Sequence, residues 1–318
     1  MTSPLIIALP SKGRLKELVE AWLADCALKL EADGGARGYS GRLKGLDGAQ
    51  VRLLSAGDIA EALDTGEVHL GVTGEDLMRE RPGDLSARAL LLRPLGFGRA
   101  DLVVATPKSW LDVATMGDLE EVAHDILART GRRIRVATKY ILQTRAFFAR
   151  HGLVDYRIVE SGGATEGAPA AGAAELVVDI TTTGATLEAN GLKVLDDGVI
   201  LKSQAQLAAS LRATWTADQM AVAEALLRQV EARAAARRSA TLTWPEIPAA
   251  ADTVVEALVA RGATRRPNGL LLAADDVAEA GRALSRAGLG PVTAAQPDFV
   301  FETESAGWTQ LQAALNKN

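Results

Sequence analysis

The chain has 318 residues, of which 48% are hydrophobic, enough for buried cores in about two or three domains. Its net charge of -5 argues against nucleic acid as a partner, and any phosphorylated ligand must be attracted by local basic clusters. The first residues show no basic segment before a long apolar run, and no apolar run has membrane-spanning length. We therefore expect a cytoplasmic protein without a membrane partner.

The first third of the chain alternates between strand and helix patterns. The sequence predicts strands at residues 5–9, 51–54, 69–74, 90–97 and 101–105, and helices at 15–30 and 56–63. Residues 33–50 are rich in glycine and predict a loop or a weak hairpin. The single cysteine, Cys26, excludes an internal disulfide and falls on an apolar helical face, so we expect a buried structural thiol.

The middle of the chain repeats the same alternation, and a different pattern follows it. Helices are predicted at residues 118–129 and 139–151, and strands at 133–137, 156–160 and 176–178. A long connecting helix begins with the capping box Thr216 to Gln219 and ends near Arg238. Beyond it, strands at 240–244, 269–273 and 299–302 alternate with helices at 252–261, 277–287 and 306–315. This part predicts a small α+β domain, compatible with a ferredoxin-like sandwich.

One segment, ELVVDITTTGATLEANGL at residues 175–192, predicts a strand, a loop and a short helix. The loop residues Thr182, Thr183, Gly184, Ala185 and Thr186 offer hydroxyls and backbone N–H groups at the start of a helix, which suit a phosphate. Asp179 lies just upstream, where a carboxylate could hold ribose hydroxyls or a metal ion. From this segment alone, an ordinary turn with N-capping threonines is an equally good interpretation.

A second loop with anion-binding character follows the first predicted strand. Lys12 and Arg14 flank Gly13 at the start of the first helix, where an anion could be held. A solvated basic turn is the alternative interpretation. At the end of the strand at 69–74, Gly74 is followed by Glu75 and Asp76, at the kind of sheet edge where open parallel sheets bind ligands.

Several common chemistries are excluded because the sequence lacks their motifs. The chain contains no GxxxxGK[ST] loop and no GxSxG elbow, and its three histidines, His69, His124 and His151, lie far apart without metal-ligand spacing. What remains is a set of turns suited to phosphate with carboxylates beside them. Such an inventory favours a reaction in which positioning and electrostatics supply most of the rate, for example glycosyl transfer from an activated sugar.

The chain contains five blocks, in order, that belong together: ALPSKGRL (8–15), GEVHLGVTGEDL (66–77), LGFGRADLVVATP (95–107), RVATKYILQTRAFF (135–148) and GATEGAPAAGAAELVVDITTTGATLEANGL (163–192). Together they resemble the ATP phosphoribosyltransferase family, the first enzymes of histidine biosynthesis. The resemblance implies two α/β lobes, like the halves of a periplasmic binding protein, with the active site between them. It implies transfer of phosphoribosyl from phosphoribosyl pyrophosphate to N1 of the ATP adenine, with magnesium and release of pyrophosphate.

The domains that this resemblance implies are divided as follows. Residues 1–105 with 187–215 would form the first catalytic lobe, 106–186 the second lobe, 216–238 the connecting helix and 239–318 a C-terminal regulatory domain. A chain of this length resembles the long form of the family, in which such a domain binds histidine as feedback inhibitor and supports a hexamer. Short forms lack the domain and need a separate regulatory subunit, so a homo-oligomer is expected, a hexamer for a long form and otherwise a dimer.

The resemblance also implies roles for individual residues. The loop at 182–186 would hold the 5′-phosphate of the sugar, and Asp179 with Glu166 would face the ribose hydroxyls. Nucleotide and pyrophosphate groups would contact Lys12, Gly13, Arg14, Arg52, Gly74, Glu75, Asp76, Lys139 and Arg145. Two highly charged anions need cations and a metal nearby, although the sequence does not identify the metal ligands. The competing hypothesis is a non-catalytic, two-lobed protein that binds a small ligand.

Overall fold

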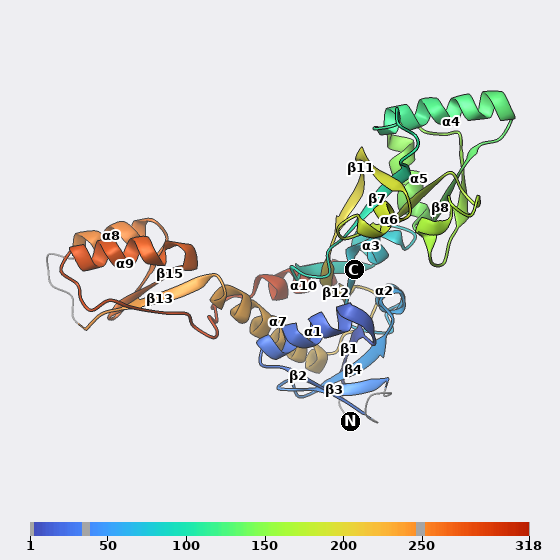
Figure 1. Cartoon of the computed structure of the whole chain (residues 1–318). Coiled ribbons are helices and arrows are strands. Elements are labelled where there is room, and N and C mark those ends of the chain that lie inside the picture. Colours follow the sequence, from blue (N-terminus) through green and yellow to red (C-terminus); the bar gives the residue numbers. More distant parts are fainter. Residues whose placement is uncertain (1–2, 34–38, 246–251, 318) are drawn as a thin grey trace.

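The computed structural model describes residues 3–33, 39–245 and 252–317, and three β-sheets organise this part of the chain. Two sheets form the cores of two α/β lobes, and the third belongs to a smaller C-terminal domain (Figure 1). That domain stands away from the lobes at the end of the long helix α7 (Ala217–Ala236). The expected α/β architecture, two lobes with a small α+β domain, is confirmed.

The first lobe is built on a seven-stranded sheet in the order β2-β3-β4-β1-β5-β12-β6. Its strands are β1 (Leu5–Pro10), β2 (Lys29–Ala32), β3 (Ser40–Lys44), β4 (Ala49–Leu54), β5 (Leu70–Gly74), β6 (Ala89–Pro94) and β12 (Ala205–Ser210). Strands β4, β1 and β5 are parallel, and β12 is antiparallel to both β5 and β6. One face is covered by α1 (Gly13–Asp25), α7 and α10 (Ala306–Leu315), and the other by α2 (Ala56–Thr65).

The second lobe has a five-stranded sheet in the order β11-β7-β10-β8-β9. Its strands are β7 (Ala100–Pro107), β8 (Ile134–Thr138), β9 (Tyr156–Glu160), β10 (Leu176–Thr181) and β11 (Leu192–Ser203). Helices α4 (Met116–Thr130) and α5 (Ile141–Arg150) pack on one face, and the short α6 (Ala185–Ala189) on the other. Helix α3 (Glu75–Glu80) follows β5 and contacts α2 of the first lobe and α5 of the second.

The boundary between the lobes differs from the one expected from the sequence. Residues 187–215 were expected in the first lobe, but β11 is antiparallel to β7 in the second sheet, so only β12 returns to the first. The chain therefore crosses between the lobes twice, once through residues 95–99 and once at Gln204. The sequence could not show this division because β11 and β12 are separated by one residue and both have strand-like patterns.

The first helix is also shorter than expected. Instead of continuing to residue 30, α1 ends at Asp25, and Ala27 adopts a left-handed backbone conformation with φ of 56°. The chain then forms β2, which pairs with β3, so much of the segment predicted as a loop or weak hairpin belongs to the sheet. Within that segment, residues 34–38 lie outside the described residues. Cys26 is buried as expected, and burial raises the pKa of its thiol to about 11.

The C-terminal domain has the ferredoxin-like arrangement that the sequence allowed. Its elements are β13 (Ser239–Thr243), α8 (Asp252–Ala260), β14 (Thr264–Arg266), β15 (Gly269–Ala273), α9 (Val277–Arg286) and β16 (Thr293–Ala295). The order β-α-β-β-α-β, with an antiparallel sheet β14-β15-β13-β16, is the ferredoxin-like pattern. The strand predicted at 299–302 is wrong, because the fourth strand is β16 and Val300 N instead donates to Ala232 O of α7.

The last helix does not belong to the C-terminal domain, although residues 239–318 were expected to form it. After β16 the chain returns along α7, and α10 packs against α7 and β6 of the first lobe. Leu311 is fully buried there, and Trp308 and Leu315 pack against the same core. The amphipathic pattern predicted the helix, but an apolar face does not tell which of two cores it covers. None of the described helices has the length and apolar character that a membrane crossing requires.

This packing predicts that α10 stabilises the first lobe. Leu311→Ala should lower the free energy of unfolding by about 2–5 kcal/mol, because it leaves a cavity in that core. Leu111→Ala is the matched control, since the Leu111 side chain is 82% exposed, and it should change stability by less than about 0.5 kcal/mol. Urea denaturation of both variants gives the comparison. Equal stability of the two variants would contradict the assignment of α10 to the first-lobe core.

Candidate active site

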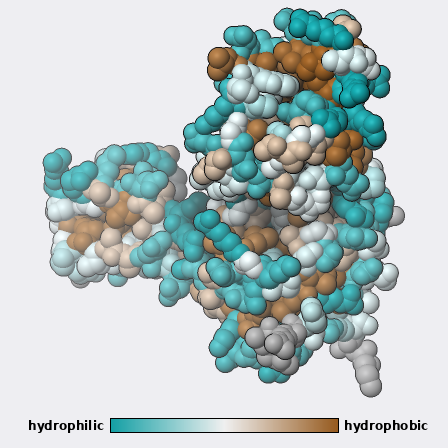
Figure 2. All heavy atoms as spheres, turned by 45° about the vertical axis from the view of Figure 1, so that its right-hand side comes forward, coloured by the Kyte–Doolittle hydropathy of each residue, from teal (hydrophilic) through white to brown (hydrophobic). Residues whose placement is uncertain are grey.

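The two lobes face each other across a cleft of about 520 Å³, beside the segments that join them. Figure 2 shows the lobes one above the other, with a hollowed surface between them. The cleft is lined by Arg14, Leu15, Leu18, Ala56, Gly74, Asp76, Leu77, Gly96, Phe97, Gly98, Arg99, Ala100, Ile180 and Thr182. Five segments distant in sequence therefore meet: the start of α1, the start of α2, the β5–α3 turn, the first crossover and the end of β10 with the loop after it.

Hydrogen bonds hold the two crossovers side by side. Leu95 N donates to Ala205 O over 2.9 Å, and Ala205 N donates to Phe97 O over 3.0 Å. The Gln204 side chain adds a third link, because its Oε1 accepts from Gly96 N over 3.0 Å. The crossovers are thus a hydrogen-bonded pair of segments that forms part of the cleft wall.

The start of α1 supplies the basic side of the cleft. Lys12 is the N-cap residue and makes no side-chain capping bond, and the first turn contains no acidic residue. The N–H groups of this turn and the exposed side chains of Lys12 and Arg14 therefore carry positive charge without an acidic neighbour in the same turn. Arg14 lines the cleft, and Gly13 provides the positive φ of 75° needed between the two basic residues.

The loop after β10 lies on the second-lobe side. Gly184 is the N-cap residue of α6 with φ of 79°, and its N–H donates to Thr181 Oγ1 over 2.8 Å. Thr182 Oγ1 donates to Arg99 O over 3.1 Å, which ties the loop to the first crossover. The side chains of Thr183, Ala185 and Thr186 are exposed, so the two hydroxyls of this group face solvent and could reach a bound anion. The capping and phosphate-binding interpretations are compatible in this loop.

Asp179 lies beside this loop with two charged neighbours. In the parallel pair β10–β8, Val177 is opposite Ala137, so two residues further on Asp179 comes beside Lys139. Burial raises the pKa of the Asp179 carboxyl, the Ile180 N–H and the Lys139 charge lower it, and the Glu166 carboxylate raises it, with a net rise. The structure thus brings together Asp179 and Glu166 of the block at 163–192 with Lys139 of the block at 135–148.

The β5–α3 turn contributes Gly74 and Glu75 from the first lobe. A Cβ atom at Gly74 would overlap the Asp76 carboxylate, so the close approach of this side chain requires glycine here. The Glu75 carboxylate accepts hydrogen bonds from Arg79 over 2.7 Å and from Gln206 over 2.9 Å. The Gln206 contact holds the turn against β12, whereas the Arg79 contact lies within α3.

Two residues at this site, Tyr140 and Ser203, were not predicted from the sequence. Tyr140 OH donates to Asp76 Oδ2 over 2.6 Å, and Ser203 Oγ donates to Asp76 Oδ1 over 2.8 Å. A tyrosine at the start of a predicted helix usually belongs to the hydrophobic core, and a serine at the end of a strand is not part of any recognisable motif. The only signal was that Tyr140 follows Lys139 within one of the five blocks.

Of the predicted site residues, Arg14, Gly74, Asp76 and Thr182 line the cleft, and the others are absent from its lining. Arg52 lies within β4, opposite Ala8 of β1, and is absent from the residues that line the cleft. Arg145 is exposed on the outer side of α5, where it lines a different depression with Tyr156 and Arg157. Arg52 and Arg145 each lie on an element that approaches the cleft. Their positions along the strand and the helix, however, keep their side chains out of its lining.

The described residues include no group of three or more His, Cys, Asp or Glu side chains placed to hold a metal ion. Magnesium bound with substrate phosphates, however, commonly uses only one or two protein carboxylates. Asp179 and Glu166 supply two carboxylates close enough to shift a pKa. The donor set therefore fits an ion that would be shared between the protein and a bound diphosphate.

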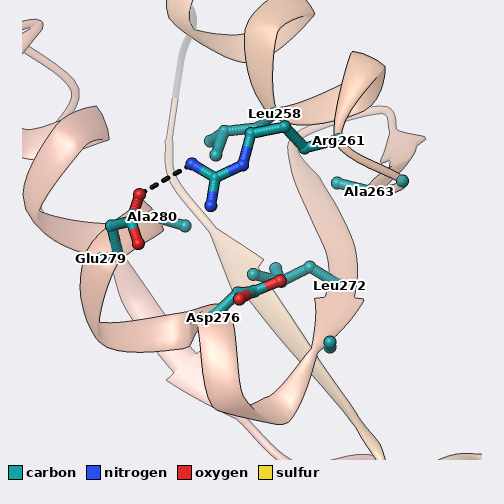
Figure 3. A pocket seen from close by; sticks show the side chains of 9 residues that line it. Leu258, Arg261, Ala263, Leu272, Asp276, Glu279 and Ala280 are labelled. Carbon is teal, nitrogen blue, oxygen red and sulfur yellow. Dashed lines mark hydrogen bonds and ion pairs between the residues drawn. The ribbon is translucent and has the colours of Figure 1, made fainter.

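The C-terminal domain has a small cavity of its own, about 60 Å³ in volume (Figure 3). Arg261 and Glu279 line it, and the Arg261 guanidinium pairs with the Glu279 carboxylate over 2.7 Å. Asp276 and Leu272 form other parts of the lining. A cavity of this size has room for a few water molecules, and it lies far along the chain from the cleft.

Comparisons with known proteins agree in one family. A family model described as HisG, ATP phosphoribosyltransferase, matches residues 55–232. The ATP phosphoribosyltransferase of Caulobacter vibrioides (strain NA1000 / CB15N) is 66% identical over 316 residues, which are 99% of each chain. That of Rhodopseudomonas palustris (strain HaA2) is 47% identical over 330 residues and covers 100% of both chains.

A solved structure shares the fold of the two lobes. In the ATP phosphoribosyl transferase (HisG:HisZ) complex from Thermotoga maritima, a chain with 23% identity matches with a TM-score of 0.54. The match covers 71% of this chain and 96% of that chain. At this identity the similarity concerns the fold alone.

The fold and the cleft define a two-lobed α/β protein with basic groups and carboxylates gathered where its lobes join. The family model spans more than half of the chain, and relatives match it from end to end. The chain belongs to the ATP phosphoribosyltransferase family, whose members are pentosyltransferases.

The charge arrangement around Asp179 predicts two opposite pKa changes. Lys139→Met should raise the pKa of Asp179 further, because it removes a charge that lowers it, whereas Glu166→Gln should lower it. Carboxyl-carbon NMR of aspartate-labelled protein measures both, with Asp179→Asn identifying the signal. Asp118, whose carboxylate caps α4, is an internal control whose pKa should stay unchanged. Shifts of the same sign in both variants would contradict this arrangement.

Proposed function

We propose that the interlobe cleft binds ATP and phosphoribosyl pyrophosphate and carries out the reaction of the family. N1 of the adenine forms a bond to C1 of the sugar while the bond from C1 to pyrophosphate breaks, and pyrophosphate leaves with the bonding electrons. This is the first step of L-histidine biosynthesis. The observation that carries the proposal is the full-length similarity to ATP phosphoribosyltransferases, and membership of an enzyme family disfavours a non-catalytic binding protein.

On the donor side, the loop at 182–186 would hold the 5′-phosphate of the sugar. The exposed hydroxyls of Thr183 and Thr186 are available as donors, and the αL conformation at Gly184 turns the chain into α6. Asp179 and Glu166 would face the ribose, where carboxylates can accept hydrogen bonds from its hydroxyls. Negative charge at this place also stabilises the positive charge that develops at C1 as pyrophosphate departs.

On the opposite wall, the basic start of α1 would receive phosphate groups. Lys12 and Arg14 are exposed and Arg14 lines the cleft, so they can neutralise charge on the leaving pyrophosphate or on the ATP triphosphate. Lys139 can do the same from the second lobe. Because the whole chain carries a net charge of -5, this local concentration of cations matters for holding two polyanions together.

Members of this family use ATP and phosphoribosyl pyrophosphate, and substrates of this kind generally require a divalent metal. We propose magnesium, held by the substrate phosphates with Asp179 or Glu166 as protein ligand. When bound, the ion would neutralise charge on the pyrophosphate group. Lys139 would then compensate the remaining charge beside Asp179, whose pKa it already affects.

The proposal predicts turnover of the purified full-length chain. Incubation with ATP, phosphoribosyl pyrophosphate and magnesium should release pyrophosphate and raise absorbance near the adenine band. Omitting phosphoribosyl pyrophosphate is the control and should abolish both signals. Absence of turnover from a folded chain, also after addition of a regulatory subunit, would contradict the proposal.

A narrower prediction concerns the threonines of the loop. Thr183→Val and Thr186→Val remove a hydroxyl and keep the side-chain shape, so each should weaken binding of phosphoribosyl pyrophosphate by about 1–3 kcal/mol. Titration calorimetry measures this. Thr130→Val, at the end of α4, is the matched control, because its hydroxyl donates to Ile126 O away from the loop. Wild-type affinity in both loop variants would leave these threonines with a capping role alone.

The C-terminal domain is proposed to be regulatory, with histidine as feedback inhibitor and a homo-oligomer as the working state. The support is its place as a separate domain outside residues 55–232, which the family model matches. Adding histidine to the turnover assay should reduce the rate, and an unchanged rate would count against this part of the proposal. Biosynthesis from ATP and phosphoribosyl pyrophosphate also supports a cytoplasmic location.

A further inference from the structure

Asp76, Tyr140 and Ser203 form a buried polar cluster at the junction of the lobes, here named the interlobe latch. The hydroxyls of Tyr140 and Ser203 each donate to one oxygen of the Asp76 carboxylate, over 2.6 and 2.8 Å. The exposed fractions are 5% for Asp76, 1% for Tyr140 and 3% for Ser203. Burial, and then the neighbouring Asp76 charge, raise the pKa of the Tyr140 hydroxyl, so it remains a donor at neutral pH.

The interlobe latch joins three elements that belong to different parts of the fold. Asp76 lies on α3 after the first-lobe strand β5, Tyr140 precedes α5, and Ser203 ends β11 immediately before the second crossover. Two further bonds strengthen the junction: Asp76 N donates to Ser203 Oγ over 3.0 Å, and Gln143 Nε2 donates to Asp76 O over 2.9 Å. The start of α5 is therefore attached directly to α3 and, through Asp76, to the end of β11 before the crossover.

Helix α3 makes a second attachment to α5 through Glu80. The Glu80 carboxylate accepts from Leu142 N over 2.7 Å and from Gln143 N over 3.2 Å. Helix α5 has no side-chain cap from its own N-cap residue, Tyr140, so Glu80 supplies the acceptors for its first turn. This capping contact and the interlobe latch fix both the position and the direction of the start of α5.

The start of α5 is next to the proposed reaction site. Lys139 immediately precedes Tyr140, and its Nζ lies 5.0 Å from the centroid of the Tyr140 ring. The Lys139 charge acts on Asp179, and the Asp179 charge acts on Tyr140. A displacement of the tyrosine would therefore move the lysine relative to Asp179 and to Arg14 on the opposite wall.

We propose that Tyr140 is a positioning residue, whose hydrogen bond to Asp76 holds Lys139 and Asp179 in place relative to the first-lobe wall that carries Arg14. The inference rests on the proposed function. Each lobe keeps its own binding groups when the interlobe latch is broken, so one substrate can still bind its lobe. The alignment of the two substrates is lost, and with it the rate of transfer.

The first test is Tyr140→Phe, which removes the hydroxyl and keeps the ring beneath Lys139. We expect kcat to fall about tenfold, while the Kd for phosphoribosyl pyrophosphate, measured by calorimetry, changes less than twofold. Tyr156→Phe is the matched control in the same lobe: its ring packs against Phe148, and no hydrogen bond of its hydroxyl occurs within the described residues. Both quantities should stay within twofold in the control. A wild-type kcat in Tyr140→Phe overturns the proposal.

A double-mutant cycle tests whether Tyr140 acts through Asp76. If it does, Asp76→Ala and the double variant Asp76→Ala with Tyr140→Phe should have the same kcat, because the second change removes a bond already lost. A further tenfold loss in the double variant overturns this route. A structural effect alone would lower the unfolding temperature and the active fraction but leave the kcat per active site unchanged.

Hydrogen exchange provides a readout that needs no turnover. In Tyr140→Phe the amides of Leu142 and Gln143, which Glu80 caps, should exchange faster than in the wild-type chain, and in Tyr156→Phe they should not. If the wild-type chain shows no turnover, the proposed function is contradicted. The hydrogen-exchange rates then still test whether the interlobe latch holds the start of α5. Unchanged exchange in Tyr140→Phe overturns the latch in either case.

Discussion

Two chain segments cross between the lobes, and they run side by side as a hydrogen-bonded pair. Leu95, Phe97 and Ala205 link the two backbones, and the side chain of Gln204 adds a bond to Gly96. Because paired segments have far fewer accessible conformations than two separate linkers, the lobes are held in a narrow range of orientations. Everything placed at the cleft depends on this pairing, since the basic wall and the carboxylate wall belong to different sheets.

The charges of the cleft follow from that arrangement. The start of α1 contributes cations and unpaired N–H groups, whereas the ends of β8 and β10 contribute Lys139 and Asp179. Carboxyl ends of parallel strands commonly carry ligand sites, and here two such edges face one another. A reaction that separates charge between a sugar and a departing diphosphate needs both signs within one site, and the cleft gathers them from both lobes.

Much of the fold and part of the site were predictable from the sequence. The periodicity of apolar residues and the capping box predicted the long helix α7, and alternating apolar patterns predicted most strands of the two lobes. These patterns are local in the sequence. Two of the five blocks contain Asp179, Glu166 and Lys139, which lie close together in the structure, whereas their roles in binding stay a prediction. By contrast, the assignment of β11 to the second sheet, the packing of α10 and the unpaired segment at 299–302 depend on distant partners that no local pattern specifies.

The site residues that the sequence misplaced or missed show the same limit. Arg145 is in a matching block, but its position on α5 turns it toward Tyr156, away from the cleft. Tyr140 and Ser203 have no motif of their own, and their importance lies in the single carboxylate that both contact. Motifs identify groups that touch a ligand more readily than groups that hold those groups in place.

The C-terminal domain is inserted between two helices of the first lobe, because α7 leads out to it and α10 returns from it. The returning segment runs along α7, where Arg233 Nη1 donates to Asp298 O over 2.7 Å and the guanidinium lies over the Phe299 ring. A change in this domain can therefore reach the first-lobe core through two covalent connections. One of these connections continues into α10, which packs against β6, and β6 leads directly into the first crossover.

The most direct test of the central claim is the electron density of the full-length chain crystallised with phosphoribosyl pyrophosphate and magnesium. The account predicts density in the interlobe cleft, with the 5′-phosphate against residues 182–186 and the ribose facing Asp179. Density for the ligand elsewhere, for example in the groove of the second lobe lined by Arg132, Arg133 and Arg157, with an empty cleft, would contradict it.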